Sequence, residues 1–188
     1  MMLGILDLDT TSNLISGFGG AILGVLATVW FERSNARKTM AFDLHRELNQ
    51  ESMMKARMDA QATLAAYSDY HLGELIREVP DELHSVWVIS GFYDRLRIAL
   101  DHRLVDSRFV SPLFGSLFCF FYFGFFEDQL LPAEWDISKN MNKLADTLRS
   151  NTPRNEWKAW VEAARREATR VRDATAKRRL KVDPQRLG

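Results

Sequence analysis

The sequence predicts an all-α protein, with a single transmembrane helix near the N-terminus followed by a bundle of about five helices. Residues 14–31 form an uninterrupted run of 18 residues without a charged side chain. In the 157 residues that follow, apolar side chains recur at spacings of three and four. No stretch alternates apolar and polar residues long enough to build a sheet. A stretch of 157 residues is typical of one domain with one hydrophobic core.

The apolar run 14–31 is long enough to cross a bilayer as a helix, which takes about 20 residues at about 1.5 Å each. A cleaved secretory signal would begin with basic residues and end in small ones. The preceding segment, residues 1–13, contains Asp7 and Asp9 but no Lys or Arg, and the run ends in the bulky sequence Val-Trp-Phe. We therefore expect an uncleaved anchor.

The charges on either side of the run predict its orientation. The N-terminal flank carries no cation, whereas the C-terminal flank carries Arg33, Arg37, Lys38 and Arg46. Cations next to a membrane helix collect on the cytoplasmic side. We therefore expect a protein of the inner (cytoplasmic) membrane, with its N-terminus outside and its large domain in the cytoplasm.

Small residues recur at every fourth position of the run, at Ser16, Gly20, Gly24 and Thr28. Helices in lipid associate through close backbone contact, which such residues permit. The stripe therefore predicts a helix-association face, used in a homo-oligomer or in a membrane protein complex. Glycine is also common in membrane helices generally, so the alternative of a stripe without a partner stays open.

The helical domain is expected to span residues 32–164. Its first helix continues from the anchor to Leu48, and a weak interruption follows at 49–52. The second helix ends before a connection that Gly73 and Pro80 mark. The apolar face of this second helix is expected at Met54, Met58, Ala62 and Ala65.

The helix expected over about 82–104, with Asp81 as its N-cap, is the best defined in the chain. Its spacing predicts the centre of the core at Val86, Ile89, Tyr93, Leu96, Leu100 and Leu104. Asp106 and Ser107 then form the cap of another helix, whose segment 113–126 carries no charge and is rich in phenylalanine. The segment is shorter than the roughly 17 residues that a crossing needs, so we expect a buried core helix. A membrane-contacting segment is the alternative.

Two more helices are expected near the C-terminus. A connection at 131–135 leads to a helix over about 137–149, and Thr152 as N-cap with Pro153 at the first helical position predicts the start of the last helix.

The end of the last helix and the tail, residues 165–188, are basic. Their cations are Arg165, Arg166, Arg170, Arg172, Lys177, Arg178, Arg179 and Lys181. They predict a solvated tail, a contact with anionic membrane lipid, or a contact with an acidic partner. Nucleic acid is not expected as a partner, because no aromatic residue after Trp160 could stack on bases.

Two stretches of the chain share a pattern with known proteins. They read LHRELNQESMMKAR (44–57) and VISGFYDRLRIALDHRLVDSRFVSPLFGSLFCFFY (88–122). In the second, an aromatic seam at Phe92 and Tyr93 leads through Asp106 to the pair Phe114 and Gly115. This pattern resembles the bacterial and phage membrane-anchored helical family catalogued as domain of unknown function 4760. The resemblance implies a fold and a location, and no catalytic residues.

The sequence contains no catalytic or ligand-binding motif. Its four histidines, His45, His71, His84 and His102, lack the paired spacing of a helical zinc site. The acidic loop between His71 and His84 is interpreted as solvated charge. The single cysteine, Cys119, excludes an intramolecular disulfide, and burial among phenylalanines would make its thiol inert. We predict no enzymatic activity, no cofactor, no metal and no small-molecule substrate.

These expectations indicate a protein that acts by binding, as a scaffold or accessory subunit of a membrane assembly, or by self-association. The alternative is a membrane-active protein, a pore-forming or lysis-related phage or toxin component, that would use the Phe-rich segment 113–126.

Overall fold

The computed structural model describes residues 8–127 and 135–182, with side chains described for 24–127 and 135–177. Within those ranges the chain is helical and has no strand, so the all-α prediction is confirmed. The elements are α1 (Leu8–Leu48), α2 (Glu51–Ala66), α3 (Leu72–Glu78), the 3₁₀ turn η1 (Pro80–Leu83), α4 (His84–Asp101), α5 (Ser107–Phe121), the π-helical turn η2 (Tyr122–Phe126), α6 (Asp136–Ser150) and α7 (Arg154–Val182). The predicted connection at 131–135 lies almost wholly outside the described residues.

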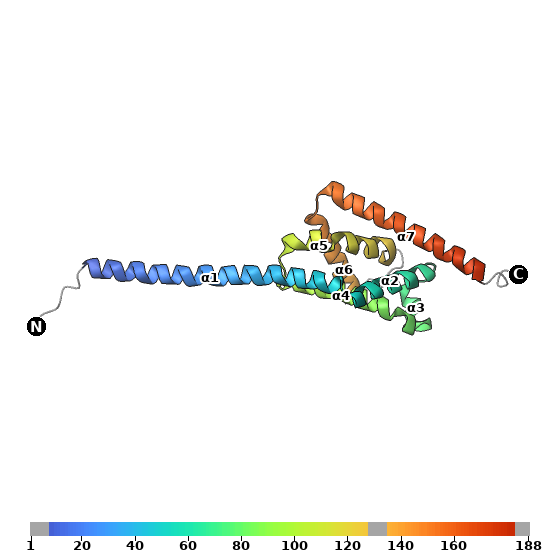
Figure 1. Ribbon diagram of the computed structural model, residues 1–188, viewed down its shortest axis with the longest axis horizontal. Helices are drawn as coiled ribbons and strands as arrows, with labels where there is room; N and C mark the ends of the chain where they lie inside the picture. Colours follow the sequence, from blue (N-terminus) through green and yellow to red (C-terminus); the bar gives the residue numbers. More distant parts are fainter. Residues whose placement is uncertain (1–7, 128–134, 183–188) are drawn as a thin grey trace, which may run out of the picture.

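Helix α1 has 41 residues and extends over about 60 Å, because an α-helix rises about 1.5 Å per residue. Only its C-terminal part is packed in the bundle, where Ala41, Leu44 and Leu48 are buried. The remainder projects away from the other helices (Figure 1), and residues 24–33 are exposed. No helix boundary separates the projecting part from the packed part.

The predicted interruption after Leu48 is confirmed, since α2 starts at Glu51. The predicted apolar face of α2 is wrong at three of its four residues. Met54 and Met58 are 44% and 70% exposed and Ala62 is also exposed, whereas Ala65 is buried as predicted. The other buried residues of the helix are Met53, Ala60 and Leu64. The buried face packs against α4. Leu64 carries more apolar surface than the alanines on the predicted face, so packing it against α4 stabilises the helix more.

The connection predicted at Gly73 to Pro80 is also wrong, because it contains α3 and η1. At the start of α3, a Glu74 carboxylate oxygen accepts a hydrogen bond from the His71 backbone N–H at 3.2 Å. The leucines of both short helices, Leu72, Leu75 and Leu83, are buried. Asp81 lies inside η1 instead of capping α4, which follows directly at His84.

Helix α4 lies in the core as predicted, with Val86, Ile89, Tyr93 and Leu96 at most 1% exposed. Leu100 is partly buried and packs against this core. Leu104 is 53% exposed, because the helix ends three residues earlier, at Asp101.

The Phe-rich segment begins as expected, with Asp106 as N-cap of α5 accepting a hydrogen bond from the Arg108 N–H at 3.1 Å. Four of its phenylalanine rings, those of Phe114, Phe118, Phe121 and Phe125, are at most 2% exposed. Among residues 24–127 and 135–177, whose side chains the structure describes, Ser107–Phe126 is the one helix whose length and composition would suit a membrane span. That range leaves out the first ten residues of the run 14–31. In Ser107–Phe126, 56% of the most apolar window is buried in the bundle. The prediction of a buried core helix agrees with this burial.

Helix α7 packs closely on α5 and η2 because two glycines leave room for it. A Cβ at Gly115 would lie 2.4 Å from a ring carbon of Trp160, and one at Gly124 would lie 3.1 Å from the Cβ of Ala168. The ring of Trp160 therefore occupies the space that a side chain at Gly115 would need.

The start of α7 differs from the prediction by one residue. The Thr152 hydroxyl donates to the Leu148 carbonyl at 2.7 Å and accepts from the Ser111 hydroxyl, so it does not cap the helix. The first helical bond runs from the Trp157 N–H to the Pro153 carbonyl, at 2.9 Å, which makes Pro153 the N-cap.

Candidate functional site

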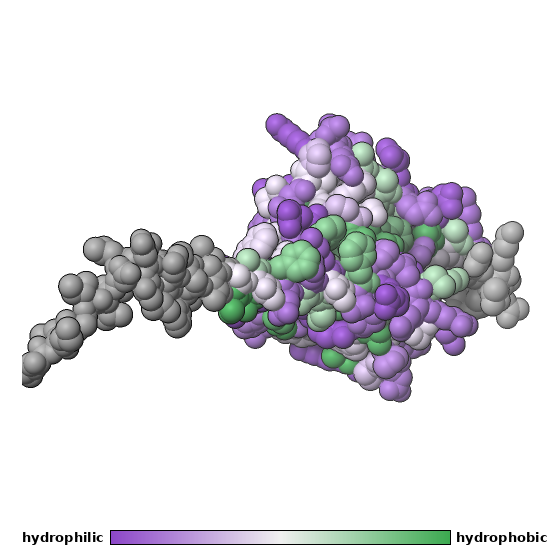
Figure 2. All heavy atoms as spheres, turned by 60° about the vertical axis from the view of Figure 1, so that its left-hand side comes forward, coloured by the Kyte–Doolittle hydropathy of each residue, from purple (hydrophilic) through white to green (hydrophobic). Residues whose placement is uncertain are grey.

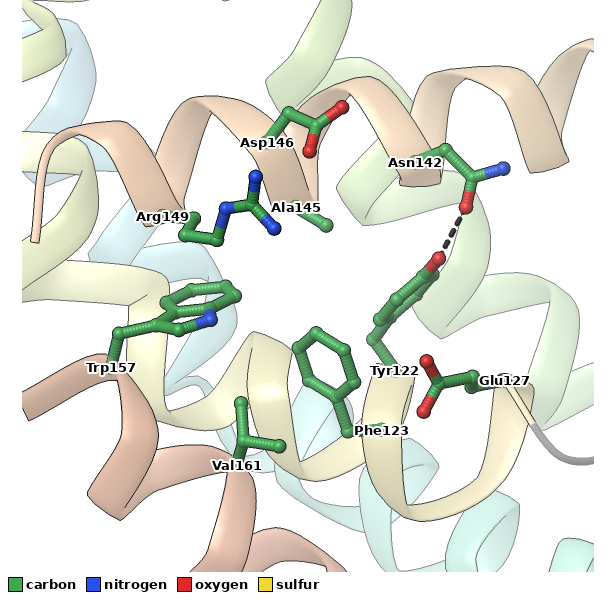
Figure 3. Close-up of a pocket in the computed structure, with 9 residues that line it drawn as sticks. All are labelled: Tyr122, Phe123, Glu127, Asn142, Ala145, Asp146, Arg149, Trp157 and Val161. Carbon is green, nitrogen blue, oxygen red and sulfur yellow. Dashed lines mark hydrogen bonds between the residues drawn. The ribbon is translucent and has the colours of Figure 1, made fainter. Parts of the chain in front are cut away.

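A groove lies on the bundle surface between η2, α6 and α7. It consists of two adjoining hollows, of about 350 and about 590 Å³, which share Arg149, Trp157 and Val161. The inner hollow is also lined by Tyr122, Phe123, Glu127, Asn142, Ala145 and Asp146, and the outer hollow by Thr152, Arg154, Lys158, Glu162 and Arg165. Figure 3 shows the residues of the inner hollow, drawn from all three elements.

Aromatic rings form one side of the inner hollow. The ring of Phe123 meets that of Trp157 edge to face, with the centroids 5.6 Å apart. Beside them, the Tyr122 hydroxyl donates a hydrogen bond to Oδ1 of Asn142 across the hollow (Figure 3). Burial raises the pKa of Tyr122, and the nearby carboxylates of Glu127 and Asp146 raise it further. The phenol therefore stays neutral and remains a hydrogen-bond donor at neutral pH.

Charged residues surround these rings. Glu127 is paired with Arg165 at 2.7 Å, and the Arg165 guanidinium lies 5.8 Å from the centroid of Phe123. In the outer hollow, the Lys158 ammonium and the Glu162 carboxylate are 3.8 Å apart. The outer hollow has four cationic residues and one acidic residue, so its charge suits an anionic group.

The lining residues of the groove combine the aromatic rings of Tyr122, Phe123 and Trp157 with nearby cations. Aromatic rings beside cations suit a ligand that is apolar in one part and acidic in another.

The candidate metal ligands and the thiol lie elsewhere. His71 precedes α3 and His84 begins α4, and the described residues contain no group of three or more His, Cys, Asp or Glu side chains placed to hold a metal ion. Cys119 is buried in α5, and this burial raises the pKa of its thiol to about 12. The predicted burial of Cys119 among phenylalanines is confirmed.

The predicted association stripe lies on the projecting part of α1. Gly24 is exposed, and a Cβ there would meet no atom within 4 Å, so this position is open to a neighbouring helix. The Thr28 hydroxyl donates a hydrogen bond to the Gly24 carbonyl at 2.9 Å, so the two positions are neighbours on one face of the helix. Ser16 and Gly20 belong to α1, and their side-chain positions lie outside the described ones.

The predicted basic residues have different surroundings. Arg165 contacts the Phe-rich segment as described above, and Arg172 donates to the Gly124 carbonyl at 2.6 Å and lies over the ring of Phe125. Arg166 and Arg170 pair with acidic residues of their own helix. Lys177 is exposed, and the side chains of Arg178, Arg179 and Lys181 lie outside the described ones. Two of the eight cations therefore stabilise the bundle.

The groove is not evident from the sequence. Trp157 lies in the predicted last helix, and Tyr122 and Phe123 lie in the charge-free segment 113–126. The signal that could indicate the groove is Trp157 near the start of a helix, with Lys158 next to it and Arg154 three positions before it.

Comparison with known proteins gives no relative: no family model, no curated protein and no solved structure matches this chain. The resemblance to domain of unknown function 4760 stays a prediction.

Proposed function

We propose that this chain is a single-pass, membrane-anchored helical protein that acts by binding, as a scaffold or accessory subunit of a membrane assembly or by associating with itself. The observation that carries the proposal is the continuity of α1, which passes without a break from a projecting apolar segment into the buried core. An anchor that continues into a core helix keeps the bundle next to the membrane.

Exposure of large apolar side chains supports the anchor. Val25, Trp30 and Phe31 are 63%, 73% and 61% exposed on the projecting part of α1. Contiguous apolar surface of this kind marks a contact with a membrane or a partner. Trp30 and Phe31 stand immediately before Glu32 and Arg33, where an aromatic belt is expected at the bilayer surface.

Burial of the Phe-rich segment supports binding over the membrane-active alternative. Inserting that segment would first require Phe114, Phe118 and Phe125, which are fully buried, to leave the core. The first two would lose their ring contacts with Phe92 and Tyr93 of α4, and Phe125 would lose its contact with Arg172 of α7. Burying such a side chain stabilises a fold by about 1.5–3 kcal/mol.

Extraction of the full-length protein from its native membranes in mild detergent tests the proposal. Particle mass and co-purifying proteins are read together, and we expect either a stoichiometric companion or a homo-oligomer. Gly20→Ile with Gly24→Ile should reduce the particle to the monomer, whereas Ala21→Ile, beside the stripe, should not. A monomer without companions in the unaltered protein contradicts the proposal, and recovery without detergent contradicts the anchor.

A further inference from the structure

The turn between α4 and α5 has an unusual residue at its centre. Helix α4 ends in a Schellman arrangement, in which the Arg103 N–H donates to the Leu100 carbonyl at 3.0 Å and the Leu104 N–H donates to the Ala99 carbonyl at 2.8 Å. This arrangement needs a left-handed residue, and Arg103 fills the position with φ 54°. Glycine is the usual residue there, because a side chain disfavours the left-handed conformation.

The strained position presents an exposed cation beside an exposed leucine. Arg103 is exposed, and Leu104 is 53% exposed. An exposed arginine at a position that glycine would occupy with less strain is a reason to look for a contact of its side chain outside the fold.

The turn is fixed beside α1, close to the end of the apolar run. The Asp106 N–H donates to the Arg37 carbonyl at 3.4 Å, and the ring of Phe109 meets that of Phe42 with centroids 5.5 Å apart. Arg37 is six residues after Phe31, which corresponds to about 9 Å along the helix. If α1 is the anchor, the turn lies about as far from the hydrocarbon as the lipid headgroups extend.

Cations collect at this end of the bundle. They are Arg33, Arg37, Lys38, Arg103 and Arg108. Asp106 is paired with Arg108 at 2.7 Å, and Asp101 is paired with Arg97 at 2.5 Å, so both carboxylates already have partners. In Figure 2, which brings this end forward, hydrophobic residues lie among hydrophilic ones on the surface.

We propose that the turn 102–106 and the adjoining cations of α1 form a surface that binds anionic phospholipid, with Arg103 at the lipid phosphates and Leu104 in the interface. The proposal rests on the proposed membrane anchor. Cations near an anionic leaflet are attracted to it, and an apolar side chain between them adds buried area. The contact would hold the bundle against the membrane instead of leaving it free to tilt about α1.

The test uses the full-length protein in lipid nanodiscs of phosphatidylcholine, with or without phosphatidylglycerol. A fluorophore is attached at Leu104→Cys, which is selective because Cys119 is buried. A matched label at Asp69→Cys, an exposed residue in the turn between α2 and α3, reports the opposite end of the bundle (Figure 1). Quenching by a quencher on the lipid headgroup is measured for both labels.

We expect stronger quenching at position 104 than at position 69, and a further increase with phosphatidylglycerol. Arg103→Gly should reduce the increase in quenching caused by phosphatidylglycerol about fivefold, as the loss of one surface cation predicts. The same variant should raise the melting temperature of the protein. Arg103→Lys should keep the quenching. A purely structural role for Arg103 predicts no change in quenching with any of these variants.

Two kinds of failure are distinguishable. If the protein enters nanodiscs but both labels are quenched equally, or phosphatidylglycerol does not change the quenching, the proposed lipid-binding surface is wrong. The proposed anchor is then not contradicted. If the protein does not enter nanodiscs, both the anchor and the surface are wrong.

Discussion

Gly115 and Gly91 are both glycines inside helices of the core, yet they have different surroundings. A Cβ at Gly115 would lie 2.4 Å from the Trp160 ring, whereas a Cβ at Gly91 would meet no atom within 4 Å. The two positions therefore separate the effect of packing from that of helix propensity.

Gly115→Ala should lower the free energy of unfolding by about 1–2 kcal/mol, because overpacking outweighs the gain in helix propensity. Gly91→Ala should leave it unchanged or raise it by about 0.5–1 kcal/mol. Urea unfolding of both variants in the same detergent gives the comparison. Equal effects of the two substitutions would show that Trp160 does not pack on Gly115 as described.

The buried thiol of Cys119 predicts a pH dependence of stability. Its pKa rises from an ordinary value near 9 to about 12 in the fold, so above pH 9 the unfolded chain loses a proton that the folded chain retains. The contribution of the neutral Cys119 thiol to the free energy of unfolding is fully present below about pH 9. It is lost as the pH rises toward about 12. Cys119→Ala should reduce the fall of the unfolding free energy across this window. An unchanged slope would mean that the thiol ionises in the folded protein.

At the scale of elements, η2 depends on a cation from α7. The carbonyl of Gly124 accepts a hydrogen bond from Arg172 at 2.6 Å, and the same guanidinium lies 5.3 Å from the centroid of Phe125. Arg172→Gln should therefore lower the free energy of unfolding by about 1–3 kcal/mol. Arg170→Gln, which removes an exposed pair with Glu167, should change it by less than about 0.5 kcal/mol. Similar losses in thermal unfolding of the two variants would contradict this role.

The helices that sequence reasoning predicted well are those with local signals. Asp106 caps α5 through its own side chain, and the spacing of Val86, Ile89 and Tyr93 follows from one helix. The errors have tertiary causes. Packing on α4 selects the buried face of α2, and a contact with Ser111 of α5 withdraws Thr152 from capping α7. Spacing within a single helix carries no information about such contacts.

The groove was not predictable for the same reason. Its walls come from η2, α6 and α7, and Tyr122 is separated from Trp157 by 35 positions in the chain (157 − 122). Only the arrangement of the three elements shows that the apolar run and the basic helix border one hollow. The association stripe, in contrast, needs only one helix, and Gly24 and Thr28 are indeed adjacent on it.

At the scale of the whole molecule, the two basic regions lie at opposite ends. Figure 1 shows α1 projecting from one end of the bundle and α7 ending at the other. Helix α7 has 29 residues and extends over about 43 Å. A membrane that holds the projecting part of α1 would therefore face the turn 102–106, and the C-terminal end of α7 would point away from it.

This arrangement predicts that equal losses of charge at the two ends have unequal effects. Replacing Arg178, Arg179 and Lys181 by glutamine should leave the headgroup quenching of a label at position 104 unchanged. Replacing Arg33, Arg37 and Lys38 by glutamine removes the same formal charge beside the apolar run. The electrostatic attraction of a cation to anionic lipid falls off within a Debye length, about 8 Å at physiological salt, so only the second set should weaken quenching. Loss of quenching with the first set would place the tail at the membrane and reverse the orientation inferred for the bundle.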